Sequence, residues 1–189
     1  DWNELRSWFL DNLEKTWIER VFYRELNEVN TVNTSFWFTK LKIDTTGEYG
    51  QFGEAFKYFH EANSKLVITG DKGSGKTFIL LKIAEGLIKW GRNDLASRVP
   101  LIVNLSSFHP NVLSFQQWLI EQIHQDYQLP RAIAENWLDA ERFDLLLDGF
   151  DEIDENWQLA ALEEINEYLK KYWSTNFVIA CRSAVFDKI

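Results

Sequence analysis

Residues 70–77 read Gly70-Asp71-Lys72-Gly73-Ser74-Gly75-Lys76-Thr77. Backbone N–H groups can converge on an anion where no Cβ blocks the approach or forbids the backbone angles, which glycine allows. In the pattern GxxxxGK[ST], the lysine ammonium suits the β and γ phosphates of a nucleotide, and the threonine hydroxyl suits Mg²⁺. The stretch therefore predicts a phosphate-binding loop whose nucleotide contacts comprise these eight residues and the adjacent Phe78.

The sequence around this loop supports the prediction. The alternative is a chance glycine turn followed by a lysine, which average residue usage would produce roughly once in a hundred chains of this length. Residues 66–69 are an apolar run rich in β-branched residues and predict a buried strand. Residues 77–90 carry apolar side chains at helical spacing, and Gly91 lies where a C-terminal cap is expected. A strand, loop and helix in this order adds the N-terminus of the helix to the anion site.

Strands and helices alternate along the rest of the chain. Four apolar runs predict strands at residues 66–69, 100–105, 143–147 and 177–180. Ser114 and Gln117 form a predicted capping box at the start of one intervening helix, and Pro130 suits the first turn of another. We expect an α/β fold, the three-layer sandwich of P-loop NTPases, with a mainly parallel sheet and an N-terminal helical segment.

Two regions are predicted from this organisation. Apolar residues at steps of three and four predict amphipathic helices within residues 1–28, and residues 30–53 suggest a connecting segment with a short extended piece at 36–38. We therefore expect a helical lead-in and linker at residues 1–63. Residues 64–189 are expected to form the P-loop NTPase core.

A second polar motif follows the predicted strand at 143–147. Asp148 comes directly after it and, together with Thr77, is the candidate to hold Mg²⁺ and its water shell. The alternative is an acidic cap on the next helix. Hydrolysis also needs an acceptor to orient the attacking water. Many phosphate-loop NTPases have a glutamate for this role directly after the metal aspartate, but here that position is Gly149. The role therefore falls to Asp151 or Glu152, and Asp151 is favoured.

One arginine follows the fourth predicted strand. Arg182 could meet the γ phosphate with its guanidinium fork, and the alternative is an exposed structural arginine. The three histidines, His60, His109 and His124, have no partner at metal-ligand spacing, and Cys181 is expected in the core. The predicted catalytic residues are therefore Asp151, Glu152 and Arg182.

Composition narrows the classes of partner. A formal net charge of −9 and the lack of a dense basic run do not indicate nucleic-acid binding. The apolar runs are far shorter than the roughly 18 residues of a membrane-spanning helix, so no membrane segment is expected. The single cysteine cannot form an internal disulfide, which favours a reducing compartment, the cytoplasm.

Four motifs together resemble the NACHT family of STAND signalling NTPases, particularly its bacterial members. They are GDKGSGKT at 70–77, VNLSSF at 103–108, LLLDGFDEI at 145–153 and IACRS at 179–183. The small Gly149 and the acidic pair Asp151 and Glu152 match the distinguishing motif of that family. The resemblance also places Ile43 and Asp44 near the nucleotide base.

The resemblance implies a Mg²⁺-dependent switch. Bound ADP would keep the protein closed, and exchange for ATP, favoured here over GTP, would open it. Slow hydrolysis would reset it, and subunits of the full-length protein would oligomerise to activate a fused effector. Bacterial relatives are associated with defence against phage.

The sequence stops at Ile189, just beyond the Arg182 motif. Relative to the family, we expect a core truncated at its C-terminus, without the final strand, the lid and winged-helix domains, or the fused sensor and effector domains. The strand before the phosphate loop would then lie at an exposed edge of the sheet. Two other functions remain open, a scaffold that holds nucleotide with little turnover and a P-loop kinase.

Overall fold

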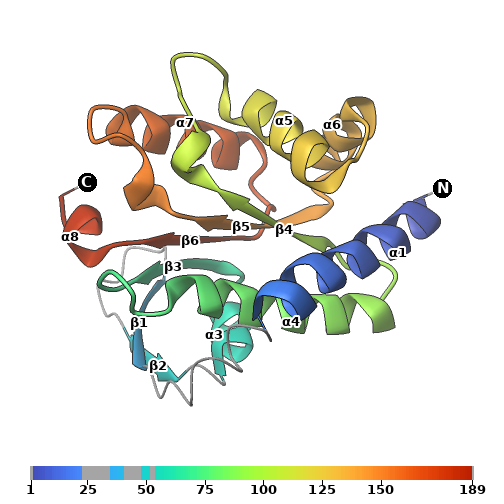
Figure 1. Ribbon diagram of the computed structural model, residues 1–189, viewed down its shortest axis with the longest axis horizontal. Coiled ribbons are helices and arrows are strands. Elements are labelled where there is room, and N and C mark those ends of the chain that lie inside the picture. Colours follow the sequence, from blue (N-terminus) through green and yellow to red (C-terminus); the bar gives the residue numbers. More distant parts are fainter. Residues whose placement is uncertain (1, 23–34, 41–47, 52–53, 189) are drawn as a thin grey trace.

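The computed structural model describes residues 2–22, 35–40, 48–51 and 54–188. Its centre is a six-stranded sheet in the order β2-β1-β3-β6-β5-β4 (Figure 1). Four neighbouring strands of this sheet are parallel. They are β3 (Lys65–Thr69), β6 (Phe177–Cys181), β5 (Phe143–Asp148) and β4 (Val99–Asn104). Each agrees with its predicted strand to within one residue at either end.

Helices cover both faces of the sheet. Figure 1 shows α5 (Phe115–Tyr127), α6 (Arg131–Asp139) and α7 (Gln158–Lys171) on one side. The other side carries α1 (Trp2–Leu13), α3 (Ala55–Glu61) and α4 (Lys76–Asn93). The buried strands are almost wholly apolar, as strands covered on both faces require. The predicted three-layer α/β architecture with a mainly parallel sheet is confirmed.

The expected exposed edge at β3 was wrong. Strand β1 (Ser35–Lys40) pairs antiparallel with β3, with Trp37 opposite Thr69. Strand β2 (Glu48–Gln51) in turn pairs antiparallel with β1. The extended piece predicted at 36–38 therefore satisfies the backbone groups of β3 on its outer side. The strand before the phosphate loop is thus an interior strand of the sheet.

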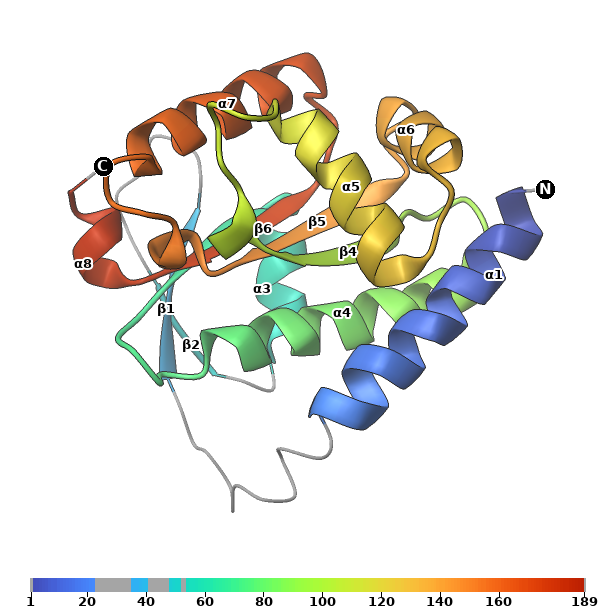
Figure 2. The same ribbon diagram turned by 45° about the horizontal axis from the view of Figure 1, so that its top comes forward.

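The N-terminal helices pack on this core. The predicted amphipathic helices correspond to α1 and to η1 (Glu14–Phe22), which is wound as a π-helix, and residues 23–28 of the prediction lie outside the described part. Figure 2 shows α1 running diagonally beside α4. Phe9 of α1 is fully buried and stacks on Tyr127 of α5 at a centroid distance of 5.0 Å. Helix α1 therefore shares the hydrophobic core of the sheet.

A buried arginine explains why the predicted helix end at Gly91 was wrong. Helix α4 continues to Asn93, and Gly91 is buried within it. The Arg6 guanidinium donates to the carbonyl oxygens of Gly91 at 2.6 Å and Asp94 at 3.0 Å. A Cβ on Gly91 would lie 3.0 Å from Arg6 Nη2. The glycine makes room for a cation at the helix C-terminus, where the helix dipole favours positive charge.

Other local signals agree with the structure to within a residue. The capping box of Ser114 and Gln117 is present at the start of α5. Pro130 is the N-cap of α6 rather than a residue of its first turn. The remaining described elements are short helices, namely η3 (Leu105–Ser107), η4 (Phe150–Glu152) and α8 (Ser183–Phe186). No helix in the described ranges is long and apolar enough to cross a membrane.

One carboxyl group is buried at the start of β5, far along the strand from Asp148. Asp144 is 3% exposed and accepts a hydrogen bond of 2.7 Å from Asn176 Nδ2. Burial raises the pKa of Asp144 to about 6, against opposing effects of Asn176 and Arg98. Because the folded pKa exceeds the ordinary 3.8, the contribution to stability is full below about pH 4 and is lost as pH rises through about 6.

We expect Asp144→Asn to remove this pH dependence. The change in pKa corresponds to about 3 kcal/mol, so above pH 7 the variant should gain up to that much in free energy of unfolding. Urea unfolding of both proteins at pH 4, 6 and 8 measures the difference. Asp187→Asn, at an exposed position, is the control and should follow the wild type. A constant difference between Asp144→Asn and wild type across this range would contradict the assignment.

Candidate nucleotide site

The phosphate loop joins the end of β3 to the start of α4. Gly73 and Gly75 have φ values of 76° and 90°, a left-handed backbone that side chains disfavour. The Ser74 N–H donates to the Asp71 carbonyl oxygen at 3.2 Å and closes the turn. The glycines of the pattern thus shape a tight turn directly before the helix N-terminus, where free backbone N–H groups favour anions.

The Ser74 hydroxyl is evidence that this loop binds a polar ligand. Its Oγ is buried, and it has no hydrogen-bond partner among the described residues. A Cβ on Gly70 would lie 2.6 Å from this oxygen, so the loop closes over it only because residue 70 is glycine. A buried hydroxyl without a partner costs about 1–3 kcal/mol, which a bound polar ligand can offset. The loop therefore fits a phosphate group.

The Lys76 ammonium lies within the phosphate loop. Its ammonium donates to the carbonyl oxygens of Gly70 and Asp71, both at 2.9 Å. These contacts keep the lysine beside the turn instead of in bulk solvent. Phe78, the last predicted nucleotide contact, is half-buried and packs against the hydrophobic core, where it supports the first turn of α4.

The two predicted metal ligands meet in the structure. Thr77 Oγ1 donates to Asp148 Oδ2 at 2.6 Å, although the residues are 71 positions apart. The Gly149 N–H donates to the other carboxylate oxygen at 2.9 Å. Burial raises the pKa of Asp148, and the hydrogen bonds from Thr77 and Gly149 oppose that shift. A hydroxyl and a carboxylate side by side are the hard oxygen ligands that suit Mg²⁺.

Both carboxylate oxygens of Asp151 contact Arg182. Its Oδ2 lies 2.7 Å from Arg182 Nε, and its Oδ1 accepts a hydrogen bond of 3.0 Å from the Arg182 backbone N–H. The Asp151 side chain is 7% exposed, whereas that of Arg182 is 43% exposed. Both oxygens of Asp151 therefore have partners, and the carboxylate fixes the arginine at the end of β6.

Glu152 is exposed and lies on the other side of Gly149. Its Oε2 accepts a hydrogen bond of 3.2 Å from Asn104 Nδ2. The structure thus separates the adjacent acidic residues, Asp151 towards β6 and Glu152 towards β4. Asn104 was missed among the predicted site residues. Its signal was the position at the end of a strand neighbouring β5, where it pairs in register with Asp148.

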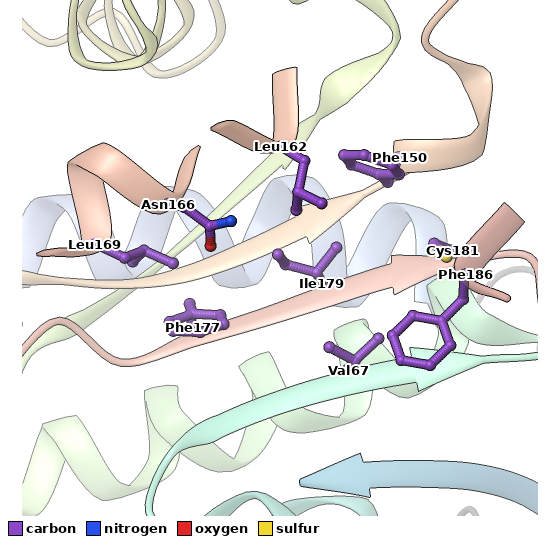
Figure 3. Close-up of a pocket in the computed structure, with 9 residues that line it drawn as sticks. All are labelled: Val67, Phe150, Leu162, Asn166, Leu169, Phe177, Ile179, Cys181 and Phe186. Carbon is purple, nitrogen blue, oxygen red and sulfur yellow. The ribbon is translucent and has the colours of Figure 1, made fainter. Parts of the chain in front are cut away.

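An apolar pocket elsewhere on the sheet has the wrong chemistry for a nucleotide. The pocket has a volume of about 310 Å³ and lies between α7, β6 and α8. Figure 3 shows Leu162, Ile179 and Phe186 among the residues that line it. Phosphates require N–H donors and cations, which the phosphate loop has. Cys181 also lines the pocket, and burial raises the pKa of its thiol to about 11, so it behaves as the predicted core residue. Ile43 and Asp44, expected near the base, lie outside the described residues.

Comparison with known families agrees with this geometry. The family model described as NACHT domain matches residues 64–188, which is more than half of the chain. The matched range begins just before β3 and includes the phosphate loop, Asp148 and Arg182. No curated protein matches the chain.

Proposed function

Because the chain belongs to the NACHT-domain family of nucleotide-binding NTPases, we propose that it binds ATP with Mg²⁺ and hydrolyses it slowly as a signalling switch. One observation carries the proposal. Thr77, the last residue of the phosphate loop, donates from its Oγ1 to Asp148 Oδ2 at the end of β5, at 2.6 Å. The buried Ser74 hydroxyl, which has no partner among the described residues, adds support from the loop itself. The residues that would bind phosphate and those that would bind the metal thus lie together at the carboxyl ends of the parallel strands.

Each residue of the loop has a role in this proposal. The backbone N–H groups of residues 70–77 bind the phosphates, and the Lys76 ammonium neutralises the β and γ phosphates. Thr77 and Asp148 hold Mg²⁺, which when bound offsets charge on the phosphate oxygens. Because catalysis of phosphoryl transfer depends mainly on positioning and charge, these contacts bind the substrate and begin to stabilise the transition state.

We assign the role of water acceptor to Glu152 instead of Asp151. The sequence favoured Asp151, but both of its carboxylate oxygens are engaged by Arg182. Glu152 is exposed beside Gly149 and can accept a proton or orient water. Asp151 then acts through Arg182, whose guanidinium meets the γ phosphate.

The wider features of the proposal rest on the family resemblance. They are preference for ATP over GTP, exchange of ADP for ATP as the trigger, oligomerisation of the full-length protein, a fused effector and a role in antiphage defence. A cytoplasmic location is part of the proposal and is in keeping with the single, buried thiol of Cys181. Retention of nucleotide without phosphate release would favour the scaffold alternative, and a phosphorylated acceptor the kinase.

The proposal is tested at Asp148. We expect Asp148→Asn to lower the Mg²⁺ affinity of the nucleotide complex by about 10-fold to 100-fold, because the carboxylate that orients the ion and its water shell is lost. Calorimetric titration of the nucleotide with and without Mg²⁺ measures the effect. Glu155→Gln, at an exposed carboxylate between η4 and α7, is the control and should leave binding unchanged. Equal Mg²⁺ dependence in Asp148→Asn and wild type would refute the metal site.

A further inference from the structure

We propose that Asn104 is a positioning residue that holds the Glu152 carboxylate in place for hydrolysis. The inference rests on the function proposed above, because it concerns the acceptor for the attacking water. Its basis is the hydrogen bond of 3.2 Å from Asn104 Nδ2 to Glu152 Oε2, which joins the end of β4 to η4.

The orientation of the Asn104 amide is fixed by a second contact. Asn104 Oδ1 accepts a hydrogen bond of 2.7 Å from the Ser106 backbone N–H. Turning the amide over would place its NH₂ group against that N–H, donor against donor. The NH₂ group is therefore directed at Glu152, and the first turn after β4 maintains this direction.

Gly149 provides the space in which the two side chains meet. Its φ of 70° is left-handed, and a Cβ there would lie 3.0 Å from Glu152 Oε2 and 3.2 Å from Asn104 Oδ1. Any larger residue at position 149 would press on both partners. The glycine directly after the metal aspartate thus allows Asn104 and Glu152 to come together above it.

The location of the pair links it to the reaction. Asn104 and Asp148 are opposite each other in the register of β4 and β5, so the amide projects from a fixed strand end next to the metal ligand. The hydrogen bond itself is exposed to solvent. An exposed hydrogen bond contributes little to the stability of the fold. Its loss should therefore affect the reaction far more than the folding.

Kinetics of Asn104 variants test the proposal. Asn104→Ala is expected to lower the single-turnover rate of ATP hydrolysis about tenfold, with nucleotide Kd unchanged. Its thermal unfolding temperature should fall only slightly, because the variant also loses the hydrogen bond from the Ser106 N–H that caps η3. Asn104→Asp retains an oxygen for the Ser106 N–H but puts a like charge against Glu152, so it should slow the reaction at least as much. Asn156→Ala removes an exposed amide outside the site and should retain the wild-type rate.

A double-variant cycle separates positioning from an independent role. If Asn104 acts through Glu152, adding Asn104→Ala to Glu152→Gln should cause no further loss of rate. An undiminished rate in Asn104→Ala, or a full tenfold loss in the Glu152→Gln background, would overturn the proposal.

NMR of the nucleotide-free protein tests the contact between Asn104 and Glu152 independently of hydrolysis. In ¹⁵N-labelled protein, the side-chain amide resonances of Asn104 should shift on Glu152→Ala, which removes the acceptor, while those of Asn156 should not. Unchanged Asn104 resonances would overturn the contact. Absence of hydrolysis by the wild type, with this shift present, would instead refute the proposed NTPase function and with it the kinetic role of Asn104.

Discussion

Replacing Lys76 with alanine is expected to abolish nucleotide binding, weakening the affinity for Mg²⁺·ATP at least 100-fold. The ammonium lies within the phosphate loop, where it donates to the carbonyl oxygens of Gly70 and Asp71 at 2.9 Å. Alanine removes the only side-chain cation that the GxxxxGK[ST] pattern directs at the β and γ phosphates. A 100-fold loss corresponds to about 2.7 kcal/mol, within reach of a charge-assisted contact to a multiply charged phosphate.

Calorimetric titration with Mg²⁺·ATP and Mg²⁺·ADP measures this loss. Thermal unfolding of the same variant shows whether the loop carbonyls tolerate the missing donor, since a fall in affinity is informative only for folded protein. Lys170→Ala removes an exposed lysine on α7 and should bind like the wild type. Wild-type affinity in Lys76→Ala would show that nucleotide does not occupy this loop.

The sequence predicted the parallel core because its signals are local. Each buried strand is a short apolar run, and α5 begins at a capping box that four residues define. The antiparallel pairing of β1 with β3 depends on backbone contacts between segments about 30 residues apart, which no short pattern describes. The prediction that the helix ends at Gly91 was wrong for a related reason, because the contact partner of Gly91 is Arg6, which is 85 residues away in the chain.

The candidate site divides in the same way. The phosphate loop and the pairing of Thr77 with Asp148 followed from strand ends that meet at one edge of a parallel sheet. The choice between Asp151 and Glu152 depended on how the chain turns after Gly149, whose left-handed φ of 70° directs the two side chains to different strands. Asn104 was missed because a single asparagine after a strand has many ordinary explanations.

Glu152→Gln is expected to lower the single-turnover rate of hydrolysis on the order of 100-fold while nucleotide still binds. Glutamine retains the size of the side chain and an oxygen for the Asn104 amide, but it cannot accept a proton from water. Asp151→Asn should have a smaller effect on the rate, about tenfold, because it weakens the contact with Arg182 without removing the acceptor. Rapid mixing of the protein with Mg²⁺·ATP, followed by measurement of released phosphate, compares the two variants.

Combining each variant with Arg182→Ala distinguishes their roles. Because Asp151 is assigned to act through the Arg182 guanidinium, which its Oδ2 contacts at 2.7 Å, Asp151→Asn should cause little further loss once that side chain is absent. Glu152→Gln should retain its full effect in that background, since water orientation and charge stabilisation are separate contributions. Asp154→Asn, in the exposed turn that follows η4, serves as the neutral control. If Asp151→Asn alone stops hydrolysis and Glu152→Gln does not, the acceptor is Asp151, and its contact with Arg182 must open during turnover.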